Sequence, residues 1–302
     1  MNVIDASVVE EVCYKLLCHA SIELPPEVEK ALHRAYQRES NETAKLYFQT
    51  MLENIAIARE QKVPLCQDTG IPIYYIGLGS EMHIKGSLRE SINRATSRAT
   101  QDVPLRQQVS NPLTREISKT NVGWGIPPIF LEYKDGEECI DITAVPRGGG
   151  AEAKWQCVHP FPGIDRKQAI IKIVLDSVSM AGGESCTPNI IGIGVGGYGR
   201  DYTEVMARKA LYRTPLHSRH PDPAVAELES TIYDAVNKMG IGPLGIGGDT
   251  TCLAVHMDIA GSHTAGASVA VAFNCWSARY SKAKISRNDE IEYLTHPGLK
   301  YT

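Results

Sequence analysis

The sequence predicts a single α/β domain in which helices flank a mixed sheet. Segments with apolar residues at helical spacing alternate along the chain with short apolar runs typical of buried strands. The 302 residues, 43% of them hydrophobic, are enough for a sizeable core. No internal repeat or low-complexity linker divides the chain. We therefore expect one domain, with a helical part at residues 1–60 and a part carrying the functional motifs at residues 61–280.

The first half of the chain is expected to begin with helices. Asp5 or Ser7 can cap a first helix, and an apolar stripe starts at Val8. The elements expected next are a helix at 43–60 with the apolar residues Leu46, Phe48, Leu52, Ile55 and Ile57, a polar turn at 66–70, a strand at 71–78, a helix at 87–100 and loops at 105–128.

The second half is delimited by turn and cap residues. Residues 129–133 and 139–145 flank Lys134-Asp135-Gly136 and predict a hairpin. The elements expected after it are a helix at 166–181 ending at Gly182, a strand at 190–195, a helix opened by a capping box of Asp201 with Glu204, a helix from Asp222 to before Gly240, and strands at 253–259 and 267–273.

Charge and terminal composition exclude several classes of protein. Lys and Arg number 31 against 35 Asp and Glu, a net charge of -4 that indicates neither a nucleic-acid nor an anionic-membrane surface. Residues 1–10 lack the features of a signal peptide, and apolar runs such as 190–195 are too short to span a bilayer. We expect a cytoplasmic protein that binds no membrane.

A glycine run at residues 192–197 matches the GxGxxG pattern of dinucleotide-binding folds. The acidic residue expected about twenty positions later, at the end of a second strand, is missing. Close backbone packing is the favoured interpretation of these glycines, and an NAD-dependent oxidoreductase is a distant alternative.

Cys66, Cys186 and Cys275 each end an apolar stretch in a turn rich in Gly, Pro or Asn. Such turns on a rigid scaffold are where sites are built. Among the eight cysteines, Cys139 and Cys252 instead lie within strand-like runs and are expected in the core. Because no CxxC spacing is present, the residues alone leave both a three-thiolate metal site and buried thiols open.

Taken together, the motifs resemble the alpha subunit of class I fumarases and of the related L-tartrate dehydratases, which are iron–sulfur hydro-lyases. The resemblance runs from about Tyr47 to Tyr280. Its markers are CQDTG at 66–70, PLR at 104–106, GGG at 148–150, CTPN at 186–189, RKA at 208–210, SRHPDP at 218–223, GIGPLGIGG at 240–248, His263 and the cysteine before tryptophan at 275.

The resemblance implies the fold of that alpha subunit and a [4Fe-4S] cluster held by Cys66, Cys186 and Cys275. Three ligands for four irons leave one iron without a protein thiolate, whereas electron-transfer clusters use four cysteines. That iron can act on the substrate as a Lewis acid. A non-catalytic iron–sulfur scaffold is a further alternative.

Other matched residues acquire roles by the same resemblance. Asp68 takes part in proton transfer, or holds the group that does, and Gln67 hydrogen-bonds the substrate through its amide. Arg106 grips a substrate carboxylate, and Gly149 or Gly150 offers a backbone N–H. The alternatives are turn chemistry for the first pair and a surface ion pair for Arg106.

Two histidines are interpreted differently. His263 lies twelve positions before Cys275, and the family pattern implies that it hydrogen-bonds substrate or orients the acid–base group. His220, within the SRHPDP motif, is interpreted as structural.

Substrate and partner are also inferred from the resemblance. Hydration of fumarate to malate is the leading activity, with dehydration of L-tartrate or another hydroxy-dicarboxylate as the alternative, since Ala151 to Trp155 replace the usual Ser-Glu-Asn after the glycines. A dicarboxylate needs cationic anchors at both ends, and only Arg106 is found here. The resemblance therefore implies a separate beta subunit, expected in an α2β2 assembly.

Overall fold

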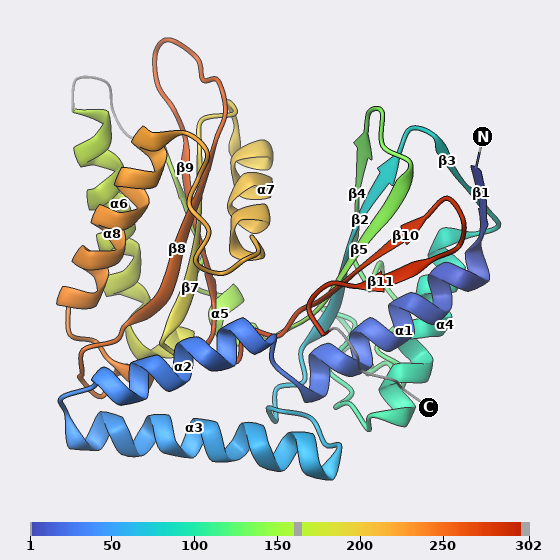
Figure 1. Ribbon diagram of the computed structural model, residues 1–302, viewed down its shortest axis with the longest axis horizontal. Helices are drawn as coiled ribbons and strands as arrows, with labels where there is room; N and C mark the ends of the chain where they lie inside the picture. The colour runs from blue at the N-terminus through green and yellow to red at the C-terminus, as the bar shows by residue number, and fades with distance from the viewer. Residues whose placement is uncertain (1, 160–164, 297–302) are drawn as a thin grey trace. The chain divides into compact units, whose positions relative to one another are not determined.

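The computed structural model of this chain describes residues 2–159 and 165–296. It contains mixed sheets flanked by helices, which confirms the expected α/β class (Figure 1). Contacts between residues divide the chain into two compact units. Unit 1 comprises residues 2–26, 53–149 and 279–296, and unit 2 comprises the described residues of 27–52 and 150–278. Packing therefore does not follow the expected division at residue 60, because each unit joins segments distant in sequence.

Unit 1 contains a five-stranded sheet in the order β11-β10-β5-β2-β4 and a separate parallel pair of β1 with β3. Its strands are β1 (Asn2–Asp5), β2 (Ile71–Gly79), β3 (Met82–Lys85), β4 (Ile129–Lys134), β5 (Cys139–Arg147), β10 (Ser281–Ser286) and β11 (Ile291–Tyr293). Helices α1 (Ala6–Ile22) and α4 (Leu88–Asp102) pack against each other. Their apolar side chains join those of β2, β5 and β10 in one core. Asp5 caps α1 as expected, accepting from Ser7 N at 2.9 Å.

The prediction of a hairpin at residues 129–145 is wrong, because its two strands do not pair with each other. Both strands form, but β2 lies between them, parallel to β4 and antiparallel to β5. Most residues of β2 are buried, whereas β4 is largely exposed. The more apolar strand therefore takes the inner position, and a turn sequence alone cannot exclude such an insertion.

Unit 2 contains a four-stranded sheet in the order β6-β9-β7-β8. Its strands are β6 (Gln156–Val158), β7 (Asn189–Val195), β8 (Cys252–Ile259) and β9 (Val269–Asn274). Helices α6 (Arg166–Ala181) and α8 (Pro223–Lys238) lie together on one face, and α7 (Arg200–Leu211) lies on the other (Figure 1). Side chains of α6, α8 and the sheet form the second core.

The remaining elements include several that the sequence pattern did not predict. Helix α2 (Pro26–Arg38) and strands β1, β3, β6, β10 and β11 are among them. Helix α3 (Glu42–Gln61) forms as expected, with Phe48 and Ile55 buried, but Leu46 and Ile57 are 60% and 49% exposed. The short elements are α5 (Gly149–Glu152) and the 3-10 turns at Gly182–Ser185 and Pro243–Gly245.

Of the two helix caps expected in unit 2, the cap of α8 is confirmed and that of α7 is not. Asp222 caps α8 by accepting from Ala224 N at 2.8 Å. The capping box of Asp201 with Glu204 is wrong, because the N-cap of α7 is Gly199 and no side chain caps that helix. Gly199 has a φ of +99°, so the chain enters α7 through a conformation that favours glycine.

The glycine run at the end of β7 allows α7 to pack directly on that strand. A Cβ on Gly192 would lie 2.2 Å from Ala207 O, and one on Gly194 would lie 2.1 Å from Thr203 O. The Thr203 hydroxyl also donates to Gly196 O at 2.6 Å. These contacts support the interpretation of the glycines as packing residues.

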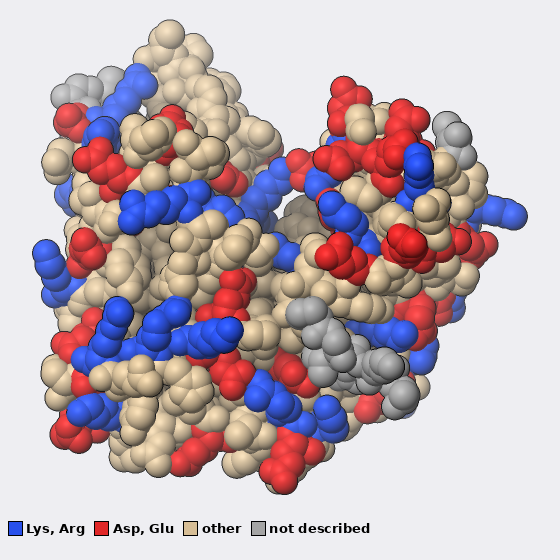
Figure 2. Space-filling model, viewed as in Figure 1, with Lys and Arg blue, Asp and Glu red and all other residues tan. Residues whose placement is uncertain are grey.

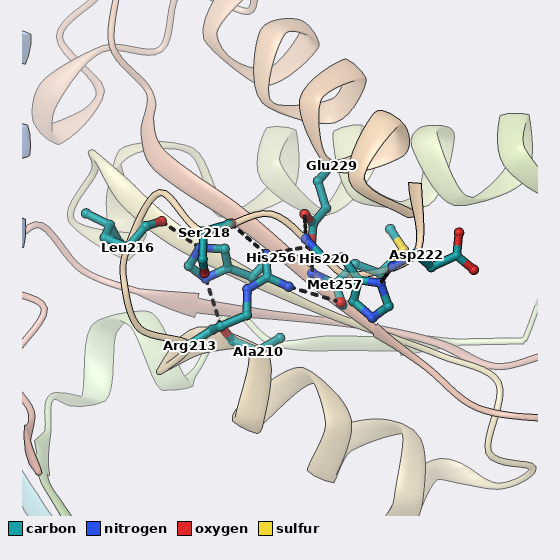
Figure 3. Close-up of polar contacts among 9 residues, drawn as sticks. All are labelled: Ala210, Arg213, Leu216, Ser218, His220, Asp222, Glu229, His256 and Met257. Atoms are coloured by element: carbon teal, nitrogen blue, oxygen red, sulfur yellow. Dashed lines mark hydrogen bonds and ion pairs between the residues drawn. The ribbon is translucent and has the colours of Figure 1, made fainter. Parts of the chain in front are cut away.

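A partly buried ion pair ties the loop after α7 to α8 and β8 (Figure 3). Arg213 Nη2 donates to Glu229 Oε1 at 2.8 Å, and Glu229 also accepts from Met257 N at 2.7 Å and His220 N at 3.3 Å. His220 Nδ1 in turn accepts from Asp222 N at 3.0 Å. The contacts of His220 are thus structural, as expected.

Charges of both signs occur over the face of the molecule seen in Figure 2, where Lys and Arg are interspersed with Asp and Glu. Within the described part of the chain, no helix combines the length and the apolar character needed to cross a membrane.

Replacing Glu229 with Gln is expected to destabilise the protein by about 1–3 kcal/mol, because the partly buried Arg213 charge then loses its anionic partner. The free energy of unfolding from denaturant titration measures this. Glu227→Gln is the matched control, since Glu227 lies on the same helix and its side chain is 76% exposed. Equal effects of the two substitutions would contradict the importance of the ion pair.

Candidate active site

The turn at residues 66–70 lies in unit 1 and leads into β2. Leu65 anchors its start, since its side chain is buried and its N–H donates to Ser21 O at 2.9 Å. Gly70 ends it with a φ of +82°, and a Cβ there would lie 2.6 Å from the Arg147 carbonyl carbon. Only glycine fits this position, so the turn is held tightly against the end of β5.

Asp68 directs its carboxylate into a set of N–H donors. Oδ1 accepts from Gln108 Nε2 at 2.8 Å and from Gly70 N at 3.1 Å, and Oδ2 accepts from Gly149 N at 2.8 Å. A carboxylate has about four acceptor positions. Three donors therefore fix its orientation and leave room for one further partner.

Gln108 holds this turn through both ends of its amide, although the sequence pattern did not single it out. Its Oε1 accepts from Gly70 N at 2.7 Å and from the Thr69 hydroxyl at 3.1 Å, while its Nε2 reaches Asp68. Asn121 in turn holds Gln108, because Asn121 Oδ1 accepts from Gln108 N at 2.9 Å. The only signal in the sequence is that Gln108 follows the PLR motif by two positions.

Arg106 is fixed through its backbone and presents an exposed side chain. Its N–H donates to the Thr69 hydroxyl at 3.0 Å, and its carbonyl accepts from Asn121 Nδ2 at 3.0 Å. The structure thus attaches Arg106 to the turn that carries Asp68. Gln67, in the same turn, is also exposed.

Arg279 is a second residue that sequence reasoning missed. It precedes β10, is 2% exposed, and donates from Nη2 to Asp68 O at 2.8 Å. Gly148 lies beside the Asp68 carboxylate, where a Cβ would approach Oδ2 to a tight 3.1 Å. Asp68 is therefore held at both its carboxylate and its backbone.

The adjacent glycines have different surroundings. The N–H of Gly149 donates to Asp68 Oδ2, and a backbone N–H offered to substrate by Gly149 or Gly150 stays a prediction. Gly150 lies in unit 2, where a Cβ would approach Glu184 O to 3.2 Å and Cys186 Sγ to 3.9 Å.

Cys186 and Cys275 occupy neighbouring turns of unit 2. The N–H of Trp276 donates to Cys186 O at 2.8 Å, which joins the two turns directly. Cys186 has a left-handed conformation, with φ 57° and ψ 61°. Cys275 Sγ lies 3.2 Å from the Ser277 hydroxyl. The structure thus brings together two of the three cysteines expected as ligands, while Cys66 belongs to unit 1.

The three cysteines expected as ligands are among four that are partly exposed, the fourth being Cys157. Cys66, Cys186 and Cys275 are partly exposed and none of the eight cysteines is in a disulfide. Burial raises the pKa of the Cys13 and Cys252 thiols well above the usual range. The described residues contain no group of three or more His, Cys, Asp or Glu side chains arranged to hold a metal ion.

His263 lies in the exposed loop between β8 and β9. Its Nδ1 accepts from Ala265 N at 3.1 Å, and its ring centroid is 5.4 Å from that of Tyr198. Because β9 runs from Val269 to Asn274, His263 and Cys275 lie beyond opposite ends of a strand about 20 Å long. The structure does not bring these two residues together, and the role of His263 stays a prediction.

Comparisons with known proteins agree on one family. The family model described as fumarate hydratase (Fumerase) matches residues 10–284. "Putative L(+)-tartrate dehydratase subunit alpha" of Methanocaldococcus jannaschii is 39% identical over 94% of this chain and 99% of its own length. "L(+)-tartrate dehydratase subunit alpha" of Escherichia coli K12 is 28% identical over 91% of this chain and 90% of its own. "Putative fumarate hydratase class I" of Geobacillus stearothermophilus is 33% identical over 95% of this chain, which spans 57% of that relative.

Gln108→Leu is expected to loosen the turn at residues 66–70, since Asp68 and Gly70 each lose a partner. The cost should be about 1–3 kcal/mol of stability. Hydrogen exchange at the Gly70 amide, measured by mass spectrometry or NMR, should speed up more than exchange in the core of β2. Gln107→Leu changes the exposed neighbouring residue, and it should leave both quantities unaltered.

Proposed function

Since the chain belongs to the fumarate hydratase (Fumerase) family, we propose that it is the alpha subunit of a [4Fe-4S]-dependent hydro-lyase acting on a small dicarboxylate. The observation that carries the proposal is the Asp68 carboxylate, which N–H donors of Gln108, Gly70 and Gly149 hold in one orientation. A fixed carboxylate with acceptor capacity left over suits proton transfer.

The donor chemistry fits an iron–sulfur cluster. Thiolates are the ligands that such clusters use, and Cys186 and Cys275 lie on joined turns without a disulfide. We propose Cys66 as the third ligand on the family resemblance. When bound, the cluster would supply a Lewis-acidic iron to polarise the substrate hydroxyl or a water.

The chain's own residues would bind the substrate and move the proton. Arg106 has a backbone fixed to the turn and an exposed guanidinium, which suits two parallel hydrogen bonds to a carboxylate. Gln67 offers an exposed amide that can donate to a substrate oxygen. Gly150 can contribute a backbone N–H. Asp68 would take the proton at the carboxylate position that its donors leave open.

We propose a separate beta subunit as the partner, in an α2β2 assembly. Relatives of nearly the same length are named as alpha subunits, and the longer fumarate hydratase relative has additional residues outside the match. A dicarboxylate bound away from water needs a cation at each end, and Arg106 accounts for one end. Obligate partners of this kind bury large apolar surfaces.

Fumarate is the proposed substrate, with L-tartrate as the second candidate. The stretch GGDTT at 247–251 is similar to fumarases, whereas Cys275 followed by Trp276 is similar to the tartrate enzymes. The tartrate candidate also has the support of the 39% identical relative.

The test of this function is an anaerobic assay of the chain, loaded with iron and sulfide, against fumarate, malate and tartrate, with and without the candidate beta subunit. We expect turnover only from the pair. Full turnover by the loaded chain alone would exclude the two-subunit proposal, and turnover of tartrate alone would change only the substrate.

Alanine at Cys66, Cys186 or Cys275 is expected to abolish the cluster, because each substitution removes one of three thiolates. Iron content and visible absorption after anaerobic reconstitution measure this. Cys157→Ala is the control, since Cys157 is also partly exposed. Full iron content in the Cys66 variant would refute that ligand set.

Arg106→Lys is expected to retain the cluster but lower kcat/KM about tenfold or more, since lysine cannot form two parallel hydrogen bonds to a carboxylate. Steady-state kinetics of the reconstituted pair measure this. Arg115→Lys, at an exposed position of the same loop region, should have no effect. An unchanged kcat/KM in the Arg106 variant would show that Arg106 does not bind substrate and would favour the surface ion pair.

A further inference from the structure

Asn189, the first residue of β7, lies between the turns that carry Cys186 and Cys275. It is 2% exposed. Its Nδ2 donates to Ser185 O and to Asn274 O, both at 3.1 Å, and its Oδ1 accepts from the Ser185 hydroxyl at 2.9 Å. Ser185 and Asn274 are the residues immediately before the two cysteines, so one amide group contacts both turns.

These contacts require an amide of this length. Both N–H groups of Asn189 point at backbone carbonyls, while its oxygen faces a hydroxyl donor. Aspartate has the same shape but no N–H, so it would set a carboxylate against two carbonyl oxygens. Alanine would remove all three side-chain contacts and leave the buried carbonyls of Ser185 and Asn274 without the Asn189 donor.

We propose that Asn189 is a positioning residue that fixes the spacing of Cys186 and Cys275 before any cluster binds. Residues behind metal ligands orient them, and pre-ordering reduces the conformational entropy lost on binding. The contacts that position Cys186 and Cys275 all lie within unit 2. Only the identity of the group that the two thiolates bind rests on the proposed function.

The experiment uses the full chain without cluster, kept reduced and anaerobic. Dibromobimane, a short reagent that bridges two thiols, is added, and mass spectrometry quantifies the Cys186–Cys275 product. We expect that product from the unaltered chain and about tenfold less from Asn189→Asp, in line with the loss of two buried hydrogen bonds. Iron uptake during reconstitution should fall in parallel.

Asn237→Ala is the matched control. Asn237 Oδ1 accepts from Thr251 N at 2.8 Å and from Cys252 N at 3.0 Å, so it also holds backbone in unit 2 without contacting either cysteine turn. Its loss should lower the melting temperature but leave the cross-link yield unchanged. Ser185→Ala removes the hydroxyl that contacts Asn189 Oδ1 and Gly182 O, but keeps both contacts of Asn189 Nδ2, so it should reduce the yield less than Asn189→Asp does. If Asn189→Asp does not fold, the Ser185→Ala variant serves as the test instead.

Three outcomes in the unaltered chain and the asparagine variants would overturn the proposal. They are the absence of the product from the unaltered chain, an unaltered yield in the folded Asn189 variant, and equal losses in the Asn189 and Asn237 variants. In the Ser185→Ala arm, a yield no lower than that of Asn237→Ala would do the same. If the cross-link depends on Asn189 but the unaltered chain takes up no iron, the positioning role stands and the proposed cluster fails.

Discussion

Side-chain amides that donate and accept at once are the interaction on which the candidate site depends. Gln108 bridges Asp68 and Gly70, and Asn121 bridges Gln108 and the carbonyl of Arg106. Asn189 does the same for the turns before Cys186 and Cys275. Turns lack the regular backbone pairing of helices and strands, so buried polar groups there need such partners. A carboxylate or hydroxyl could satisfy only part of each set.

Glycine provides the second constraint, because it lets backbones approach where a side chain would collide. Gly70 lies against the Arg147 backbone, and Gly192 and Gly194 lie against α7. The first contact brings the turn of Asp68 to the end of β5, and the other two bring a helix onto β7. The same property serves a site in one unit and packing in the other, which explains why a glycine pattern alone does not identify a cofactor site.

In the proposed chemistry, the residues that orient Asp68 and Arg106 differ from the groups that would contact the substrate. Asp68 is oriented by Gln108 and by the backbone of Gly149, and Arg279 fixes its carbonyl. Arg106 is attached through its backbone, which leaves its guanidinium exposed. A site built in this way keeps reacting groups in place while leaving their remaining hydrogen-bonding capacity for substrate.

Much of the local structure could be predicted from the sequence alone. Helical spacing and caps such as Asp5 and Asp222 identified α1 and α8, and the motifs identified the family. These features depend on residues close together in the chain, where side-chain period and cap chemistry act directly. The motifs that contain Asp68 and Arg106 are also contiguous, and the roles expected of these two residues stay predictions.

Only the tertiary structure shows strand order and contacts between residues that are far apart in the sequence. The insertion of β2 between β4 and β5, the attachment of Gln108 and Arg279 to Asp68, and the joining of the Cys186 and Cys275 turns all link residues far apart in sequence. A sequence pattern records the period of burial along one segment but not which other segment covers it. Strand order and hydrogen-bond partners are therefore set by competition among all segments for the same buried positions.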